Sequence, residues 1–423
     1  MCKTTTPPRP ASKDDIRKQQ PNSAAGAVIP LKSYLAKYVA QFSSQLVPST
    51  PPTLPSDVDP NAYKRVAFSI LPLLGHPDSN AVSPYYAGVF DDDTDFSASL
   101  VKVAALFAAG QFLANAKNAA PSAGPDVFKD FNAGLKAEIN TNADSRILSA
   151  TLPSGFQLLP QTSTILTGLG SAAAFVKSFS DNLSAMIVNS SDPGAGVCIG
   201  RLGLGYISAV LKENSFFDKT LPPGPDPPYN AAATGRGIWL TGDYVHSIPL
   251  TSALRIPCVN DHRDTELTTT RQMCRMFAMI RIKQLPEHDL DTNALMQSLL
   301  NEPKTGPDAT GPWLGRNPGT EPLFTILQDK IGFAGLGTIQ QPNVYSEGLI
   351  IKWKDMTKVV AFNKIIDATN ANPAIHLSGE IAVCWQNLLA EHIDGGTADS
   401  PMFGPIVDVI NHAVSDFLAQ AAL

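Results

Sequence analysis

The chain has 423 residues, more than one hydrophobic core usually holds, and its net charge of −6 argues against a surface that binds nucleic acid throughout. Charged residues make up only 17% of the sequence, below the ~25% of an average globular domain. Small neutral polar side chains take their place, which favours extensive contact between subunits. Five cysteines without C-x-x-C spacing indicate reduced thiols, and no apolar run is long enough to predict a membrane span.

Residues 1–30 predict a disordered basic arm, because they contain five prolines and almost no large apolar side chains. Five basic residues against two acidic ones give this arm a net charge of +3 and leave −9 for the rest of the chain. We expect its basic side chains to contact RNA phosphates weakly and without sequence preference. These side chains are Lys3, Arg9, Lys13, Arg17 and Lys18.

Residues 31–62 predict a tethered amphipathic helix followed by a Pro-rich linker. Apolar residues recur at helical spacing over 31–47, and five prolines follow between positions 48 and 60. The helix should dock on its own chain or on a neighbouring subunit, where it would act as an assembly arm. Its apolar stripe consists of Leu31, Leu35, Tyr38, Phe42 and Leu46.

The body of the chain is predicted to be mainly helical. Residues 63–220 should form a helical lobe that begins with a strand; the strand and helices are expected at 65–74, 95–114, 125–140, 163–188 and 201–213. A Pro/Gly-rich passage at 221–229 then opens a loop-rich mixed lobe over 221–320. In this lobe we expect extended segments at 237–245 and 248–259, and helices at 265–284 and 292–302.

Residues 321–423 predict a second helical part. Helices are expected at 321–331, 375–393 and 404–421, and one strand at 348–353. The expected fold class is therefore mainly α with minor β (α+β). Its parts would be a large helical shell domain, a protruding or arch-like lobe and an extended N-terminal arm.

No motif in the sequence predicts catalysis, a metal site or a cofactor. Asp91, Asp93 and Asp95 have the first spacings of an EF-hand loop, but Phe96 and Lys102 stand where that loop requires Gly and Glu. The glycines over 194–200 miss the spacing of a dinucleotide fingerprint, and the seven histidines form no zinc motif. The sequence therefore favours a protein that is not an enzyme.

Taken together, the Pro-rich basic arm from Lys3 to Lys18, the tethered helix from Leu31 to Val47 and the charge-poor helical body resemble the coat proteins of partitiviruses, small double-stranded RNA viruses. This resemblance implies a capsid protein that self-assembles as domain-swapped dimers into an icosahedral shell around a double-stranded RNA genome. The implied partners are further copies of the chain, RNA and a viral polymerase, without a membrane. The implied location is the virion and the host cytoplasm, and no catalytic residue is implied.

Two other classes of protein stay open. A non-viral helical scaffold or nucleic-acid-binding oligomer would share the arm and the long loops, but would form small finite oligomers. An enzyme of another family would use Asp243 and His246 for base catalysis, although no nucleophile motif accompanies them.

Overall fold

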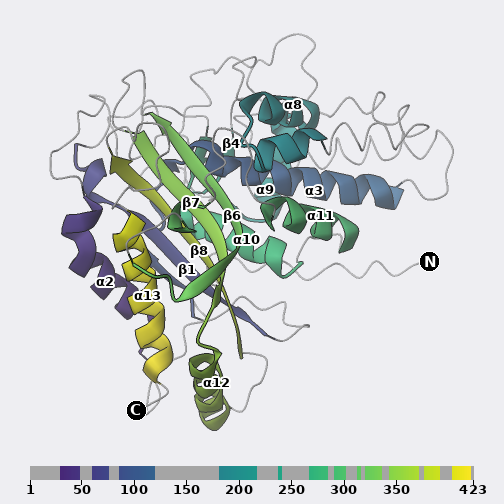
Figure 1. Cartoon of the computed structure of the whole chain (residues 1–423). Helices are drawn as coiled ribbons and strands as arrows, with labels where there is room; N and C mark the ends of the chain where they lie inside the picture. Colours follow the sequence, from purple (N-terminus) through teal and green to yellow (C-terminus); the bar gives the residue numbers. More distant parts are fainter. Residues whose placement is uncertain are drawn as a thin grey trace.

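The computed structural model describes residues 29–47, 60–75, 85–119, 181–216, 237–240, 266–283, 290–301, 312–315, 320–335, 343–370, 376–390 and 403–420. These residues form a five-stranded sheet with helices on both faces, as Figure 1 shows.

All neighbouring strands of the sheet run antiparallel, in the order β2-β1-β8-β7-β6. The strands are β1 (Ala67–Leu74), β2 (Ala87–Val89), β6 (Phe324–Gly335), β7 (Asn343–Trp353) and β8 (Leu377–Ala390). Because β8 pairs with β1 on one side and with β7 on the other, the two ends of the chain meet in one sheet. β6 forms one edge of this sheet.

Helices from the two ends of the chain, α2 (Leu31–Leu46) and α13 (Phe403–Ala419), pack together on one face of the sheet, and α12 (Met356–Asn370) contacts α13 and β8 (Figure 1). The Tyr38 hydroxyl of α2 donates a hydrogen bond to Asp416, and the Tyr38 ring stacks on His412 with centroids 5.0 Å apart. The helix predicted at 31–47 is thus confirmed. Its stripe is covered by the chain's own α13, so contact of this helix with a second copy stays a prediction.

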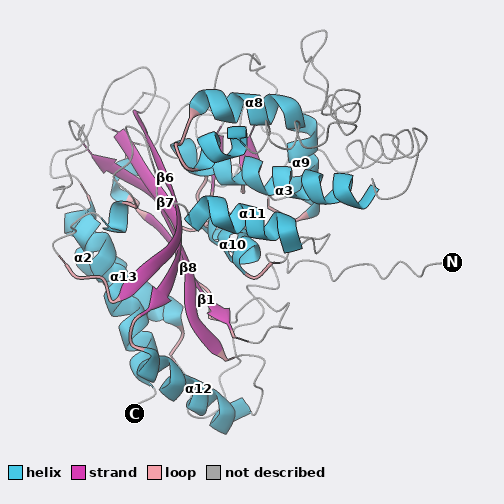
Figure 2. Cartoon of the chain, turned by 45° about the vertical axis from the view of Figure 1, so that its right-hand side comes forward, coloured by secondary structure: helices cyan, strands magenta, loops and turns pink. Residues whose placement is uncertain are grey.

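A lobe of helices covers the opposite face of the sheet (Figure 2). It contains α3 (Lys102–Ala119), α8 (Asp192–Leu202), α9 (Leu204–Glu213), α10 (Thr270–Arg281) and α11 (Leu290–Asn301). A small sheet in the order β3-β5-β4 lies beside it, formed by β3 (Asp95–Phe96), β4 (Trp239–Leu240) and β5 (Glu266–Thr268).

The apolar character of α3 follows from its central place in this lobe. The window Ala98–Asn115 is long and apolar enough for a membrane span, but 83% of it is buried inside the chain. Side chains from Val103 to Phe112 are buried, since α8, α9, α10 and α11 pack around the helix. We therefore describe α3 as the core helix of the lobe.

The predicted fold class, mainly α with minor β and built around a large helical shell domain, was wrong. Helices were predicted at 321–331 and 375–393, but residues 324–331 lie in strand β6 and residues 377–390 form strand β8. β8 is the central strand and is buried on both faces, so its apolar residues form a nearly continuous run without the alternation that marks a strand. Because β6 and β8 are strands, the fold is α+β around an antiparallel sheet.

Other expected elements are confirmed in type, with ends that differ by up to five residues, although the first residues of the helices expected at 95–114 and 265–284 form strands β3 and β5. They are the strand at 65–74, the helix at 95–114, the helices at 201–213, 265–284 and 292–302, the strand at 348–353 and the helix at 404–421. The basic arm with Lys3, Arg9, Lys13, Arg17 and Lys18, the helix at 125–140 and the segment 248–259 lie outside the described residues.

Candidate active site

Ser99 and Lys102 lie one helical turn apart at the start of the core helix. The short helix η2 (Ala98–Val101) leads directly into α3, so positions 99 and 102 fall on the same face. The Nζ of Lys102 lies 2.9 Å from the Oγ of Ser99. Lys102 is fully buried, while Ser99 is partly exposed to solvent. A partly exposed hydroxyl beside a buried amine is the arrangement of a serine nucleophile and its base.

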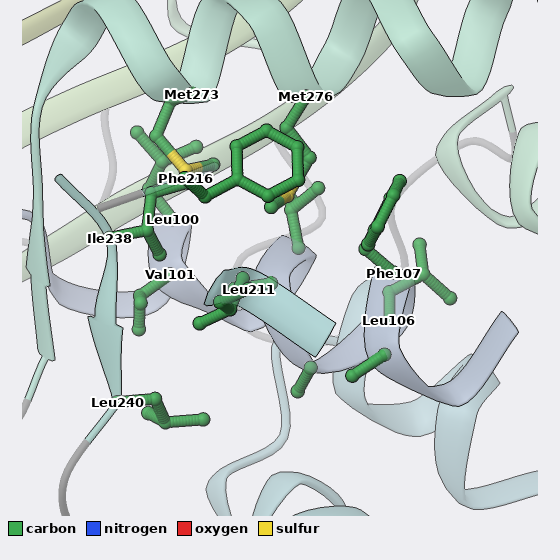
Figure 3. Close-up of a cluster of buried hydrophobic side chains, with 14 of the residues drawn as sticks. Leu100, Val101, Leu106, Phe107, Leu211, Phe216, Ile238, Leu240, Met273 and Met276 are labelled. Atoms are coloured by element: carbon green, nitrogen blue, oxygen red, sulfur yellow. The ribbon is translucent and has the colours of Figure 1, made fainter. Parts of the chain in front are cut away.

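The residues between this pair anchor the turn in the hydrophobic core of the lobe. Leu100 and Val101 are completely buried, and Figure 3 shows them among side chains from α9, β4 and α10. These neighbours include Leu211, Phe216, Ile238, Met273 and Met276. Such packing holds the backbone of the turn in place and leaves Ser99 to face outward.

Backbone contacts also fix the turn against both sheets. The Ser97 N–H donates to the carbonyl of Glu266 on β5 at 3.2 Å, and the Ser346 hydroxyl of β7 donates to the Ser97 carbonyl at 2.7 Å. Ala98, directly before Ser99, has a φ of 50°. A non-glycine residue in this region is strained and persists where its surroundings impose it, as they often do at functional sites.

A second segment meets Lys102 at the start of α8. Lys102 Nζ donates to the carbonyl of Ser190 and to Oδ1 of Asp192, each at 2.6 Å. Asp192 is the first residue of α8, and the preceding Ser191 caps that helix by accepting from the Gly194 N–H at 3.1 Å. Ser190 has a φ of 52°, so the backbone is bent sharply where it approaches the amine.

The third segment is the edge strand β6. Lys330 is 1% exposed, and its Nζ donates to the Ser190 hydroxyl at 2.7 Å and to the Ile331 carbonyl at 3.0 Å. Two residues further on, a Cβ at Gly332 would lie only 2.1 Å from the Ser97 carbonyl oxygen. The glycine therefore allows β6 to touch the turn that carries Ser99, called the nucleophile turn below.

A chain of contacts thus runs from Ser99 to Lys102, then through the Ser190 residue to Lys330. Two buried lysine amines lie around two serines, and the carboxylate of Asp192 is in direct contact with one of them. Burying a lysine is costly unless its charge is compensated, and stability alone gives no reason to place two of them here. The arrangement is suited to moving protons to and from a reacting hydroxyl.

The residues proposed from the sequence lie elsewhere. Asp243 and His246 fall outside the described residues. In the acidic run, Asp91 and Asp92 form ion pairs with Arg271, and the glycines over 194–200 lie in α8. Within the described part of the chain, no group of three His, Cys, Asp or Glu side chains could hold a metal ion.

The three segments that supply Ser99, Ser190 and Lys330 were missed, although each carries a short signal. They read Ser99-Leu-Val-Lys102, Ser190-Ser-Asp192 and Lys330-Ile-Gly332, close to the set S-x-x-K, S-D-N and K-T-G of class A β-lactamases and penicillin-binding proteins. Ser191 and Asp192 replace the Asp and Asn of S-D-N, so this segment keeps only the Ser, and Ile331 replaces the Thr of K-T-G. Each segment fixes only two or three residues and is common by chance, so the signal lies in their meeting in space.

Comparison with known proteins gave matches among solved structures alone. No family model and no curated protein matches the sequence. A β-lactamase from Desulfarculus baarsii is 12% identical, with a TM-score of 0.41, over 93% of this chain and 99% of that chain. A class A β-lactamase of the last common ancestor of Gram-negative bacteria is 14% identical, with a TM-score of 0.41, over 92% and 99%. The transpeptidase domain of a D,D-transpeptidase from Legionella pneumophila is 9% identical, with a TM-score of 0.39, over 92% and 99%.

These findings correct the functional prediction. The similar structures named here are enzymes, and no capsid protein is among them. The predicted partitivirus capsid, its virion location and the absence of enzymatic activity were therefore wrong. With TM-scores below 0.5 these likenesses do not carry a mechanism, which rests instead on the contacts of Ser99, Lys102, Ser190 and Lys330.

Proposed function

We propose that the chain is a serine acyl transferase or hydrolase that attacks an amide carbonyl through Ser99 and forms an acyl-enzyme. One observation carries this proposal: the continuous set of contacts from Ser99 Oγ to Lys102 Nζ, and through Ser190 to Lys330 Nζ. The first segment matches the S-x-x-K of the penicillin-recognising enzymes, and the other two follow in the same chain order with the Ser of S-D-N and the Lys and Gly of K-T-G.

Acylation begins when Lys102, as a free amine, takes the proton of the Ser99 hydroxyl. The Ser99 Oγ then bonds to the carbonyl carbon and gives a tetrahedral intermediate. This intermediate collapses by breaking the bond to the leaving nitrogen, which takes a proton from the Ser190 hydroxyl. Ser190 regains a proton from Lys330, whose Nζ lies 2.7 Å away. Both lysines thus have a defined task.

Deacylation returns the protons to their starting places. A water molecule or an amine attacks the acyl carbon, and its proton restores Lys330. The bond to Ser99 breaks, and Lys102 gives its proton back to the Oγ. Attack by water makes the enzyme a hydrolase and attack by an amine makes it a transferase, so the lifetime of the acyl-enzyme in buffer with and without an added amine distinguishes the two.

The position of β6 favours an extended amide substrate. β6 is an edge strand that passes directly beside the nucleophile turn, and an extended peptide can add to such an edge through backbone hydrogen bonds. Ile331 brings no hydroxyl where the K-T-G motif has Thr. We therefore expect penicillins to bind more weakly than the motif set alone suggests, and a test needs reagent in excess.

The test is covalent labelling with a fluorescent penicillin, read by intact-protein mass and by the labelled peptide. We expect one adduct of the penicillin's mass on the peptide that contains Ser99. The Ser99→Ala variant should lose the adduct and keep its thermal unfolding temperature. The matched control is Ser298→Ala, because Ser298 is exposed on α11 and lies far along the sequence from the site.

A fluorophosphonate probe, which reacts with activated serines without needing a particular substrate, separates the reaction type from the substrate. If this probe labels Ser99 and penicillin does not, the role of Ser99 as a nucleophile is supported and a lactam substrate is refuted. Absence of labelling by both reagents, in a protein that melts cooperatively, refutes the proposed function.

A further inference from the structure

Three hydrogen-bond acceptors from the described residues surround the Lys102 amine, as many as an ammonium group has protons. They are Ser99 Oγ at 2.9 Å, the Ser190 carbonyl at 2.6 Å and Asp192 Oδ1 at 2.6 Å. An ammonium ion satisfies all three at once. A neutral amine has two protons and one lone pair, so it would turn the bond with Ser99 around and accept the hydroxyl proton.

Asp192 is the acceptor that distinguishes this site from one with the S-D-N segment, which has Asn at this position. Its carboxylate lies at the first position of α8, where the helix dipole favours a negative charge. Its side chain is 59% exposed, while that of Lys102 is completely buried. The carboxylate thus reaches from the surface to the amine, and its charge attracts the proton on Lys102 in a way that an amide oxygen does not.

Other charged groups near this amine act less directly. Lys330 of β6 opposes a charge on Lys102 through the shared Ser190 residue. Glu266 of β5 contributes its carbonyl to Ser97. Glu347 of β7 instead accepts from the Trp313 N–H at 2.8 Å and from Trp385 Nε1 at 3.2 Å.

Further charged residues lie on the elements that pack against α3. They are Asp329 on β6, next to Lys330 along the strand, Arg201 on α8, Lys212 and Glu213 on α9, and Arg271, Arg275 and Arg281 on α10. Successive residues of a strand point to opposite faces, so Asp329 points away from the face that carries Lys330. Among the residues that the structure describes, Asp192 brings its carboxylate into hydrogen-bond contact with Lys102.

We propose that Asp192 is a positioning residue that holds Lys102 as an ammonium ion in the resting enzyme, so that Ser99 becomes reactive only as the pH rises. This inference rests on the proposed function, because it concerns the base of the same reaction. Replacing the carboxylate with an amide keeps a hydrogen bond to the amine and removes the charge. Because Asp192 is exposed and screened, we expect the effect to be on the order of one pH unit, or tenfold in rate at a fixed pH.

The test compares the rate of Ser99 labelling by a fluorophosphonate probe between pH 5 and pH 10 in the parent chain and in Asp192→Asn. In the parent chain the labelling rate should rise with pH, and in the variant the same rise should occur about one pH unit lower. Asp367→Asn is the control, since this exposed carboxylate pairs with His376 away from the site. If the labelling rate of Asp192→Asn rises at the same pH as in the parent chain, the inference is overturned even though Ser99 is labelled.

A second measurement does not depend on any reaction. NMR of lysine labelled at Cε with carbon-13, with the Lys102 signal identified by its loss in Lys102→Arg, follows the charge of this amine directly. Its titration midpoint should fall in Asp192→Asn and should stay in place in Asp367→Asn. If no probe labels Ser99, the proposed function fails; an unchanged midpoint refutes the role of Asp192 separately.

Discussion

Replacing Gly332 with Ala should disable the site without unfolding the protein. The added Cβ would lie 2.1 Å from the Ser97 carbonyl oxygen, 2.3 Å from Ser346 Oγ and 2.9 Å from the Leu100 N–H nitrogen. Ordinary contact distances are near 3.5 Å, so β6 or the nucleophile turn must move by about 1 Å. Two of these three atoms belong to backbone that the core holds in place, so rotating a side chain cannot relieve the overlap.

This displacement sets the expected magnitudes. A shift of about 1 Å between the nucleophile and its partners can cost on the order of 100-fold in rate. Overpacking of this kind typically destabilises a protein by about 1–3 kcal/mol. We therefore expect Gly332→Ala to lower the rate of Ser99 labelling by roughly two orders of magnitude, while the chain still unfolds cooperatively at a somewhat lower temperature.

The assay is the second-order rate of Ser99 labelling by the fluorophosphonate probe, measured beside thermal unfolding. Gly200→Ala is the matched control, because a Cβ at Gly200 meets nothing within 4 Å and the residue lies in α8. Ala in a helix is favoured over Gly by about 1 kcal/mol, so the control should be slightly stabilised with an unchanged labelling rate. A Gly332→Ala chain that labels as fast as the parent would show that β6 does not position the nucleophile.

Three further predictions concern the rest of the fold. Burial, followed by the nearby Asp329 charge, raises the pKa of Glu347 well above its usual value. The free energy of unfolding should therefore fall as the pH rises above about 4.5, by up to about 1.4 kcal/mol per pH unit. Glu347→Gln should flatten this slope in urea titrations at several pH values. Burial raises the pKa of the Cys198 thiol to about 12, so iodoacetamide should leave it unmodified in the native chain at pH 8 and label it after denaturation, as peptide mass would show. Leu35→Ala should cost about 2–5 kcal/mol, because the side chain is fully buried, whereas the exposed Gln41→Ala should be neutral; a loss that changed with protein concentration would contradict packing within one chain.

The sequence predicted most helices correctly because their apolar residues recur with a helical period that one chain segment carries by itself. The stripe of α2 and the apolar face of α13 are examples. It failed at β8, since a strand buried on both faces has no alternation and its apolar run then resembles that of a buried helix. It also failed at β6, whose polar residues Gln328, Asp329 and Lys330 interrupt the alternation of a strand. Because both strands were predicted as helices, the predicted fold was mainly helical, and Lys330 was not placed on a strand of the sheet.

The candidate site was present in the sequence only as separate fragments. Ser99 and Lys102 are close along the chain, and their spacing on one helical turn follows from local geometry. Ser190 and Lys330 come from segments about 90 and 230 residues further on, and nothing local indicates that they meet. The pairing of β8 with β1 and β7 and the packing of β6 on the nucleophile turn bring them together. The sequence by itself determined the helices and the reactive groups, whereas the contacts among those groups, and hence the chemistry, were decided by long-range packing.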